Sequence, residues 1–96
     1  MRPSLMLDLK RSAIREAVSR SPNLTNPRVF GSVLHGTDHD GSDLDLLVDS
    51  SGASLFDLAR LKIELESLLG VRVDLLTPGF LPSTFRDKVL AEAQPV

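Results

Sequence analysis

The stretch VFGSVLHGTDHDGSDLDLLVD, residues Val29 to Asp49, carries the pattern from which the fold and the chemistry of this sequence can be predicted. An apolar run ends in a Gly-Ser pair, and a polar loop follows. Two aspartates separated by one leucine then begin the next apolar run. A turn that binds an anion, followed by a pair of acids that binds a cation, would together make a site for a phosphorylated ligand.

The two aspartates belong to a predicted strand over residues 42–48, in which polar and apolar residues alternate. Asp43 and Asp45 share one face, with Cα atoms roughly 6.6 Å apart from the rise of a strand. Carboxylates this close repel unless a cation lies between them, and Mg²⁺ is commonly held by one or two carboxylates plus substrate phosphates. The pair therefore predicts half of a magnesium site. The alternative is the solvent-facing side of an amphipathic strand.

A third acid, Asp74, lies inside another predicted strand, over residues 71–77. A carboxylate within a buried strand is costly unless it is paired or coordinates a metal. If this strand lies beside the first acidic one, Asp74 completes a cluster of three acids. Such a cluster could hold a catalytic metal and accept a proton from an attacking hydroxyl. The simpler alternative is an exposed acid on an edge strand.

Gly31 and Ser32 follow a short predicted strand over residues 28–30 and are expected to open a short helix or a turn. Glycine has no Cβ, so phosphate oxygens can approach the main chain. The N–H groups at a helix start and the Ser32 hydroxyl can then bind an anion. Alone, a Gly-Ser pair is usually a turn, and the glycine spacing matches neither the dinucleotide fingerprint nor the P-loop. The order of anion pocket, acid pair and third acid indicates phosphoryl or nucleotidyl transfer.

The first part of the chain is predicted to be helical. Apolar residues recur at helical spacing over residues 5–19, with Ser4 as the N-cap and the Ser21-Pro22 pair at the end. A turn is predicted at residues 49–52, after the acidic strand.

Two further helices are predicted after that turn. Ser54 and Asp57 form a capping box that opens a helix ending at Gly70, and Pro82 suits the first turn of a last helix. The order helix, strand, strand, helix, strand, helix predicts an α+β fold with one sheet layer covered by helices. The residues of these two helices expected to face the core are Leu55, Leu58, Leu61, Leu65, Leu68, Leu69, Phe85, Val89 and Leu90.

Composition excludes several classes of protein. The net charge is −2, so no overall positive field attracts nucleic acid. There is no cysteine, which excludes disulfides and thiolate metal sites and is compatible with a reducing cytoplasm. Asp8 and Lys10 interrupt the apolar start, so no signal peptide is predicted, and no run reaches the length of a membrane span. We expect a cytoplasmic protein with a single domain, residues 1–96, that binds neither nucleic acid directly nor membranes.

The motif GSVLHGTDHDGSDLDLLV resembles the signature of the DNA polymerase beta-like nucleotidyltransferases, in which Gly-Ser and a spacer precede Asp-apolar-Asp. The short length and the ending VDLLTPGFLP…VLAEAQPV resemble the minimal nucleotidyltransferase branch, the antitoxin partners of HEPN ribonuclease toxins. The resemblance runs from about Val29 to the end of the chain. It implies a mixed sheet flanked by helices.

The resemblance also implies roles for individual residues and a reaction. Its members move AMP from ATP to a tyrosine of the HEPN toxin, within a hetero-oligomer, and so silence the toxin. Gly31, Ser32 and Ser42 would then lie at the ATP. The residues implied as catalytic carboxylates and as ligands of the Mg²⁺ cofactor are Asp43, Asp45 and Asp74.

One residue departs from the pattern of the family. Relatives often carry arginine just before the second glycine of the loop, where this chain has His35. Arginine is always charged and grips phosphate with two donors, whereas histidine is mostly neutral at pH 7. Phosphate affinity or base preference is therefore expected to differ. The alternative for His35, and the expectation for His39, is a solvated loop histidine without a role.

Two other functions remain open from the sequence. The first is an antitoxin that neutralises its partner by contact alone, with catalysis incidental or lost. The presence of all three acids favours the enzyme over this alternative. The second is transfer to a small molecule or to an RNA 3′ end, against which the lack of a basic surface argues.

Overall fold

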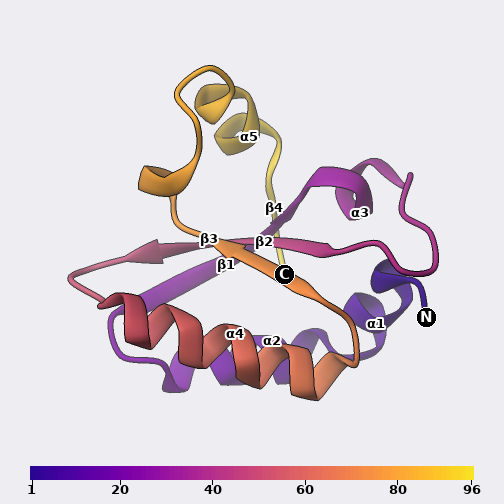
Figure 1. The fold of residues 1–96 in the computed structure, drawn as a ribbon, viewed down its shortest axis with the longest axis horizontal. Helices are drawn as coiled ribbons and strands as arrows, with labels where there is room; N and C mark the ends of the chain where they lie inside the picture. The colour runs from indigo at the N-terminus through magenta and orange to yellow at the C-terminus, as the bar shows by residue number, and fades with distance from the viewer.

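A four-stranded mixed sheet organises the computed structural model, which describes residues 1–96 (Figure 1). The strand order is β3-β2-β1-β4; β1 pairs antiparallel with β2 and with β4, while β2 pairs in parallel with β3. The predicted α+β fold, a mixed sheet flanked by helices, is confirmed. The strands are β1 (Leu24–Phe30), β2 (Leu44–Ser50), β3 (Val73–Leu76) and β4 (Gln94–Pro95).

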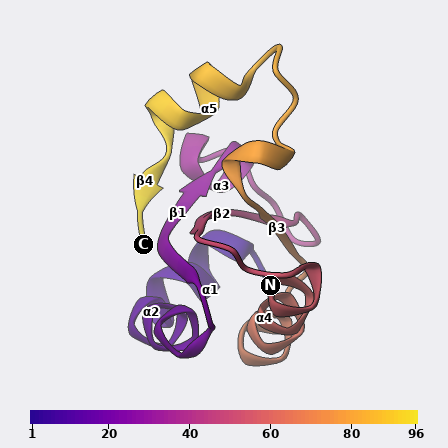
Figure 2. The ribbon, with the colours of Figure 1, turned by 90° about the vertical axis from the view of Figure 1, so that its left-hand side faces the viewer.

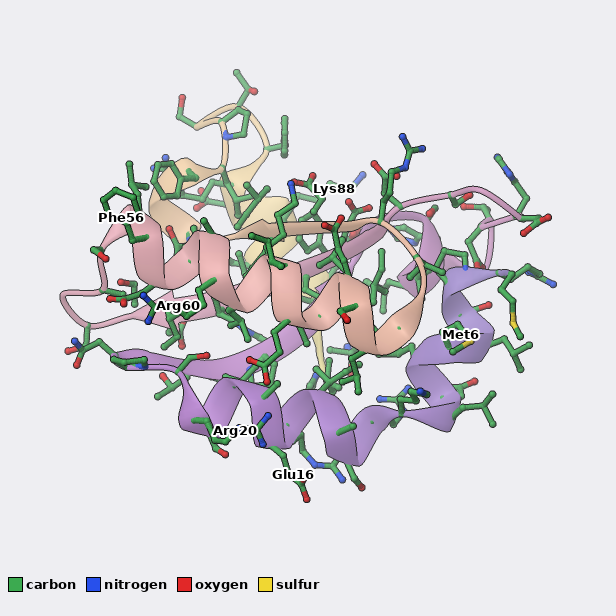
Figure 3. The ribbon with its side chains drawn as sticks, turned by 60° about the horizontal axis from the view of Figure 1, so that its bottom comes forward. Met6, Glu16, Arg20, Phe56, Arg60 and Lys88 are labelled. Atoms are coloured by element: carbon green, nitrogen blue, oxygen red, sulfur yellow. The ribbon has the colours of Figure 1, made fainter.

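Helices cover the two faces of this sheet unequally. Helices α1 (Pro3–Leu9), α2 (Arg11–Arg20) and α4 (Leu55–Leu69) lie below the sheet in the views of Figures 1 and 2. The shorter helices α3 (Gly31–His35) and α5 (Arg86–Glu92) lie above it, with the 3₁₀ turn η1 (Pro78–Phe80). Figure 3 shows α2 and α4 side by side on the lower face, where Arg20 pairs with Glu64 at 2.6 Å. No helix combines the length and the apolar character that crossing a membrane requires.

The main core lies between the sheet and helices α2 and α4. Strand β2 contributes Leu44, Leu46 and Val48 to it, as the alternation predicts. Leu47 points to the opposite face and is nevertheless fully buried, as is Leu81 after η1. The upper face of the sheet is therefore also partly covered, and the acids that share this face with Leu47 are not simply in open solvent.

The prediction of one continuous N-terminal helix is wrong. It is divided into α1 and α2 at Lys10, whose backbone leaves the helical region. Lys10 donates a hydrogen bond from Nζ to the Leu68 carbonyl of α4, and the change of direction buries Leu7 while Leu9 stays 66% exposed. Ser4 is not the N-cap, because α1 begins at Pro3 and Arg2 occupies that position.

Strand ends also differ from the prediction. Strand β1 begins at Leu24 rather than at Arg28. The sequence pattern did not predict its first residues because Asn26, with φ +58°, and Pro27 lie in an irregularity of the β1–β2 pairing. Strand β2 begins at Leu44, after Asp43, and continues to Ser50 through the predicted turn at residues 49–52. The short strand β4 was not predicted, because two residues ending in proline carry no strand pattern.

The helix after β2 follows the prediction more closely than the last helix. Ser54 and Asp57 form the capping box, and Gly70 ends α4 in the left-handed region. Its buried residues are Leu61, Leu65 and Leu69, whereas Leu55 is 69% exposed. The last helix does not include Pro82: it starts at Arg86, and no residue of it is buried.

Candidate functional site

The parallel pairing of β2 with β3 places Asp45 directly beside Asp74, as partners in register. Both residues alternate with core leucines and valines, so their side chains lie on the upper face of the sheet, opposite α2 and α4. Strand β3 is an edge strand, and Asp74 is exposed there. Asp74 is thus an exposed acid of an edge strand, and it is also the neighbour of Asp45; its role in a three-acid cluster remains a prediction.

Asp45 is half-buried, and both burial and the neighbouring acids act on its pKa. Burial first, then the charge of Asp74 and then that of Asp43, raise the pKa of Asp45 to about 6. The charge of Asp45 therefore interacts with the charges of the two other predicted acids, Asp43 and Asp74. A cation among them would relieve this repulsion.

Gly31, the first residue of helix α3, lies against Asp45. It has φ +72°, and a Cβ added to it would lie 2.1 Å from Asp45 Oδ2. No non-glycine residue could occupy this position without displacing that carboxylate. The main chain at the start of α3 is thus in contact with the acid that the sequence predicted as a metal ligand, and no side chain caps that end of the helix.

Ser32 follows in the first turn of α3. Its carbonyl accepts hydrogen bonds from the main-chain N–H of Thr37 at 2.9 Å and from the Thr37 hydroxyl at 3.4 Å. The helix ends at Gly36, which is left-handed. The predicted helix opening at the Gly-Ser pair is confirmed, and these bonds fix Ser32 while its hydroxyl has no partner within the chain.

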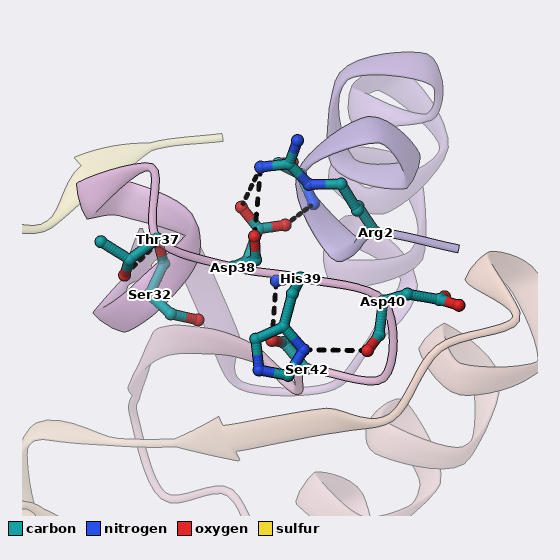
Figure 4. A network of polar contacts seen from close by, with 8 residues as sticks. Arg2, Ser32, Thr37, Asp38, His39, Asp40 and Ser42 are labelled. Atoms are coloured by element: carbon teal, nitrogen blue, oxygen red, sulfur yellow. Dashed lines mark hydrogen bonds and ion pairs between the residues drawn. The ribbon is translucent and has the colours of Figure 1, made fainter.

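Ser42 plays a different part in the structure. Its hydroxyl accepts a hydrogen bond from the His39 N–H at 2.9 Å, and its own N–H donates to the His39 carbonyl at 3.0 Å. Ser42 thus closes a turn just before the acids (Figure 4). Its predicted contact with nucleotide remains a prediction, and the observed bonds are those of a turn.

Asp38 is a structural residue of this loop that the sequence reasoning missed. Its side chain is fully buried and accepts a hydrogen bond from the Ser4 N–H at 2.9 Å, and Arg2 Nη2 lies 3.4 Å from its Oδ1 (Figure 4). The Ser4 N–H is the largest cause that lowers the pKa of Asp38, and burial opposes the shift. The start of α1 is thereby attached to the loop that connects the Gly-Ser pair to the acids. The sequence carries no local signal for this role, because the partner of Asp38 comes from the distant residue Ser4.

Asp43 lies just before β2 rather than within it, and its side chain is half-exposed. Arg72 Nε lies 3.0 Å from its Oδ1, so a protein cation already pairs with this carboxylate. As they stand, the side chains form no group of three or more His, Asp or Glu that could hold a metal ion. Carboxylate oxygens from β2 and β3 still fit Mg²⁺, which is usually held by one or two carboxylates with phosphates completing its ligands.

The two histidines are placed apart. His35 Nε2 lies 3.2 Å from a carboxylate oxygen of Glu92 in α5, whereas His39 Nδ1 contacts the Asp40 carbonyl at 2.9 Å in the loop. His35 also lines a cavity of about 320 Å³ between α3 and α5 that includes Gly31. His35 is therefore a neighbour of the acidic site, and His39 belongs to the turn.

Comparison with known proteins identifies the family of the chain. The profile of the nucleotidyltransferase domain family matches residues 11–96. A candidate protein adenylyltransferase of Methanocaldococcus jannaschii is 44% identical over 66 residues, which cover 68% of this chain and 71% of the relative. The protein adenylyltransferase MntA of Thermococcus cleftensis is 43% identical over 65 residues, covering 67% of this chain and 66% of MntA.

Solved structures agree with the fold. A candidate minimal nucleotidyltransferase is similar with a TM-score of 0.84 and 44% identity, covering 97% of this chain and 95% of its own. A toxin–antitoxin complex with AMP-PNP contains a chain similar with a TM-score of 0.75 and 24% identity, covering 88% of this chain and 69% of that one. The second likeness concerns the fold alone.

Proposed function

Because this chain belongs to the nucleotidyltransferase domain family, we propose that it is an antitoxin that transfers AMP from ATP to a tyrosine of a HEPN-type ribonuclease toxin. The two archaeal relatives bear the name protein adenylyltransferase, which supports a protein as the acceptor. The toxin–antitoxin complex of similar fold supports a toxin as that protein and an adenine nucleotide as the donor. A hetero-oligomer with the toxin and a cytoplasmic location belong to the same proposal.

One observation carries the proposal: Asp45 and Asp74 are neighbours in register, and the main chain at Gly31 touches the Asp45 carboxylate. An anion-binding main chain and a pair of acids thus meet at one point. This is the arrangement that phosphoryl transfer needs, because positioning and charge neutralisation supply most of its catalysis.

Each group has a defined task in this reaction. Mg²⁺, held by Asp45 with Asp43 or Asp74, would neutralise the phosphates and polarise the phosphorus–oxygen bonds. The main-chain N–H groups that follow Gly31, together with the Ser32 hydroxyl, bind and orient the phosphates.

The transfer step itself exchanges one phosphorus–oxygen bond for another. The tyrosine oxygen forms a bond to the α-phosphorus of ATP. The bond from that phosphorus to the bridging oxygen of the β-phosphate breaks, and pyrophosphate leaves with the electron pair. Asp74 accepts the phenol proton, because its place on the exposed edge strand β3 lets a side chain from another protein approach it.

The experiment that tests the reaction is mass spectrometry of the co-expressed HEPN toxin after incubation with this protein, Mg²⁺ and each NTP in turn. A gain of one or more adenylyl groups on a tyrosine, with ATP alone, is the expected result. The variant Asp43→Asn/Asp45→Asn should give no gain, and Asp8→Asn, an exposed acid of α1, serves as the control. Transfer that persists in the double variant would refute the assignment of the acids.

Neutralisation of the toxin separates catalysis from binding by contact. The double variant should fail to protect cells from the toxin when both are at native expression. If it protects fully, contact is sufficient, and the chain is a binding antitoxin rather than an enzyme in its biological role.

A further inference from the structure

We infer that Lys88 of α5 binds the terminal phosphates of the nucleotide donor, in the cavity between α3 and α5. The inference deepens the proposed function, since it requires that a nucleotide triphosphate or a polyphosphate binds beside Gly31. It assigns to α5, a helix without buried residues, the task of supplying the positive charge that the α3 side of the site lacks.

The cavity lies next to the acidic site. It has a volume of about 320 Å³, and its wall includes Gly31, the glycine in contact with Asp45. Lys88, Val89 and Glu92 line it from α5, and Phe85 lines it from the residue before that helix. His35 lines it from α3 and lies 3.2 Å from the Glu92 carboxylate, so Glu92 already has a partner across the cavity. A ligand whose phosphates lie against the main chain at Gly31 therefore extends into the space in front of Lys88.

Charge shows why a cation is needed there. ATP carries about four negative charges at neutral pH, and Mg²⁺ compensates two of them. Three acids, Asp43, Asp45 and Asp74, add further negative charge to the same face of the protein. These negative charges oppose the binding of a triphosphate nearby. The end of the triphosphate therefore requires a positive side chain that is not already paired with an acid.

Lys88 is the cation in the cavity wall that is not engaged elsewhere. The other basic residue of the wall, His35, lies against Glu92 of α5. Outside the cavity wall, Arg72 pairs with Asp43. Arg86 donates to the Leu81 carbonyl at 2.7 Å, which holds it against the main chain. Lys88 forms neither an ion pair nor a hydrogen bond in the structure, and it is exposed at the cavity. In Figure 3 it lies on the α5 side of the molecule, away from Glu16 and Arg20 of α2.

The same cavity offers two aromatic rings, Phe30 and Phe85, so a nucleotide base is the competing occupant. Two features favour the phosphates. Gly31 has no side chain to fill its part of the cavity, so a phosphate can approach the main chain there. Lys88 is a point charge suited to phosphate, and a flat stacking partner would be arginine or an aromatic ring.

The test measures binding of AMP, ATP and inorganic tripolyphosphate by isothermal titration calorimetry, with Mg²⁺ and without toxin. The variants are Lys88→Gln and Lys88→Arg, with Lys62→Gln on α4 as the matched control, because Lys62 is an exposed lysine on the opposite side of the sheet. We expect Lys88→Gln to lower the affinity for ATP and for tripolyphosphate roughly three- to tenfold, the range for one exposed charge-assisted contact. Its affinity for AMP should not change. Lys88→Arg, which keeps the positive charge, should retain most of the affinity for ATP and tripolyphosphate. Lys62→Gln should bind all three ligands as the unchanged protein does.

The outcomes separate this inference from the proposed function. If ATP binds and Lys88→Gln binds it equally well, the inference is wrong and the transferase proposal is untouched. If AMP weakens as much as ATP, the cavity holds the nucleoside, and the inference is wrong. If tripolyphosphate weakens in Lys88→Gln while no transfer to the toxin occurs, the inference stands and the proposed reaction fails. If the unchanged protein binds neither ATP nor tripolyphosphate, both are overturned.

Discussion

Gly31 and Asp45 approach so closely that no side chain fits between them: a Cβ on Gly31 would lie 2.1 Å from Asp45 Oδ2. The contact lies between the residue that follows β1 and an acid of the neighbouring strand β2. The main chain that is predicted to bind an anion and the carboxylate that is predicted to hold the metal are therefore in contact. Any change at residue 31 acts on both.

The variant Gly31→Ala tests this relationship. The new methyl group must displace the Asp45 carboxylate, and a misplacement of about 1 Å in a catalytic group can cost roughly 100-fold in rate. We expect transfer of AMP to the toxin to fall by about that factor or more, measured by mass spectrometry over a time course.

Gly36→Ala is the matched control for this loss. Gly36 has the same φ of +72°, but a Cβ there meets nothing within 4 Å. Both variants therefore have similar backbone strain, roughly 1–2 kcal/mol, and only Gly31→Ala displaces an acid. Equal activity losses in the two variants would show that strain, rather than the contact with Asp45, is responsible.

Replacing Asp45 should stabilise the metal-free protein at neutral pH. Its pKa of about 6 in the folded chain exceeds the ordinary value of 3.8, so the folded state binds the proton more tightly than the unfolded state. Asp45 therefore lowers the free energy of unfolding as the pH rises from about 4 to 6. Because the group is only half-buried, the loss is discounted to about 1–2 kcal/mol.

Thermal melting of Asp45→Asn with EDTA present checks this expectation. At pH 7 the variant should melt at a higher temperature than the unchanged protein, and the difference should shrink as the pH is lowered to 4. Asp8→Asn is the control, because it removes one acid from an exposed position of α1, away from Asp45. A variant less stable than the parent at pH 7 would mean that the Asp45 carboxylate makes a favourable contact in the folded state.

Alternation and turn chemistry predicted much of this molecule because they are local. The period-two pattern of β2 fixed which face Leu44 and Leu46 occupy, and the capping box fixed the start of α4. The proximity of Asp45 and Asp74 was predictable only on the condition that β2 and β3 are adjacent. Pairing between strands separated by a helix is set by tertiary packing, and the sequence does not encode it locally.

The elements that the sequence missed depend on contacts between distant segments. The break at Lys10 depends on a carbonyl of α4, and β4 exists because the chain end pairs with β1. Asp38 looked like any loop aspartate, and its burial depends on α1 folding back onto the loop. In the same way, Arg72 faces Asp43 only because β3 lies beside β2.

The ion pair between Arg72 and Asp43 should compete with metal binding. Arg72 Nε lies 3.0 Å from Asp43 Oδ1, so a metal that uses this carboxylate must displace the guanidinium. Arg72 is largely exposed and Asp43 half-exposed, and exposed ion pairs contribute little, about 0.2–1 kcal/mol by double-mutant cycles. We expect Arg72→Gln to bind Mn²⁺, as a probe for Mg²⁺, about two- to fivefold more tightly without nucleotide, measured by electron paramagnetic resonance.

Arg60→Gln is the control for the change in net charge, because Arg60 is an exposed arginine of α4 on the lower face (Figure 3). Its Mn²⁺ affinity should equal that of the unchanged protein. Weaker Mn²⁺ binding by Arg72→Gln would contradict competition and would mean that Arg72 holds Asp43 in a position that metal binding requires.

Asp38 should be the acid whose loss unfolds the chain most readily. Its side chain is fully buried, and its removal leaves the Ser4 N–H without its partner, while Arg2 keeps only its bond to the Asp38 carbonyl. Hydrogen bonds to charged groups contribute about 1.5–3 kcal/mol, so Asp38→Ala should lower the free energy of unfolding by roughly that amount in urea titrations at pH 7. Asp8→Ala, which removes an exposed acid from α1 itself, should change it by less than about 0.5 kcal/mol.

The pH dependence separates the charge of Asp38 from its shape. Its pKa is lowered below 3.8 in the folded protein, so the stabilisation that it provides is complete at pH 7, well above 3.8, and is lost as the pH falls from there through the folded value. Asp38→Asn keeps the shape and one acceptor oxygen but has no charge to lose. The gap in stability between Asp38→Asn and the unchanged protein should therefore be largest at pH 7 and close below pH 4. A gap that does not change with pH would assign the effect to packing of the loop against α1 rather than to the carboxylate.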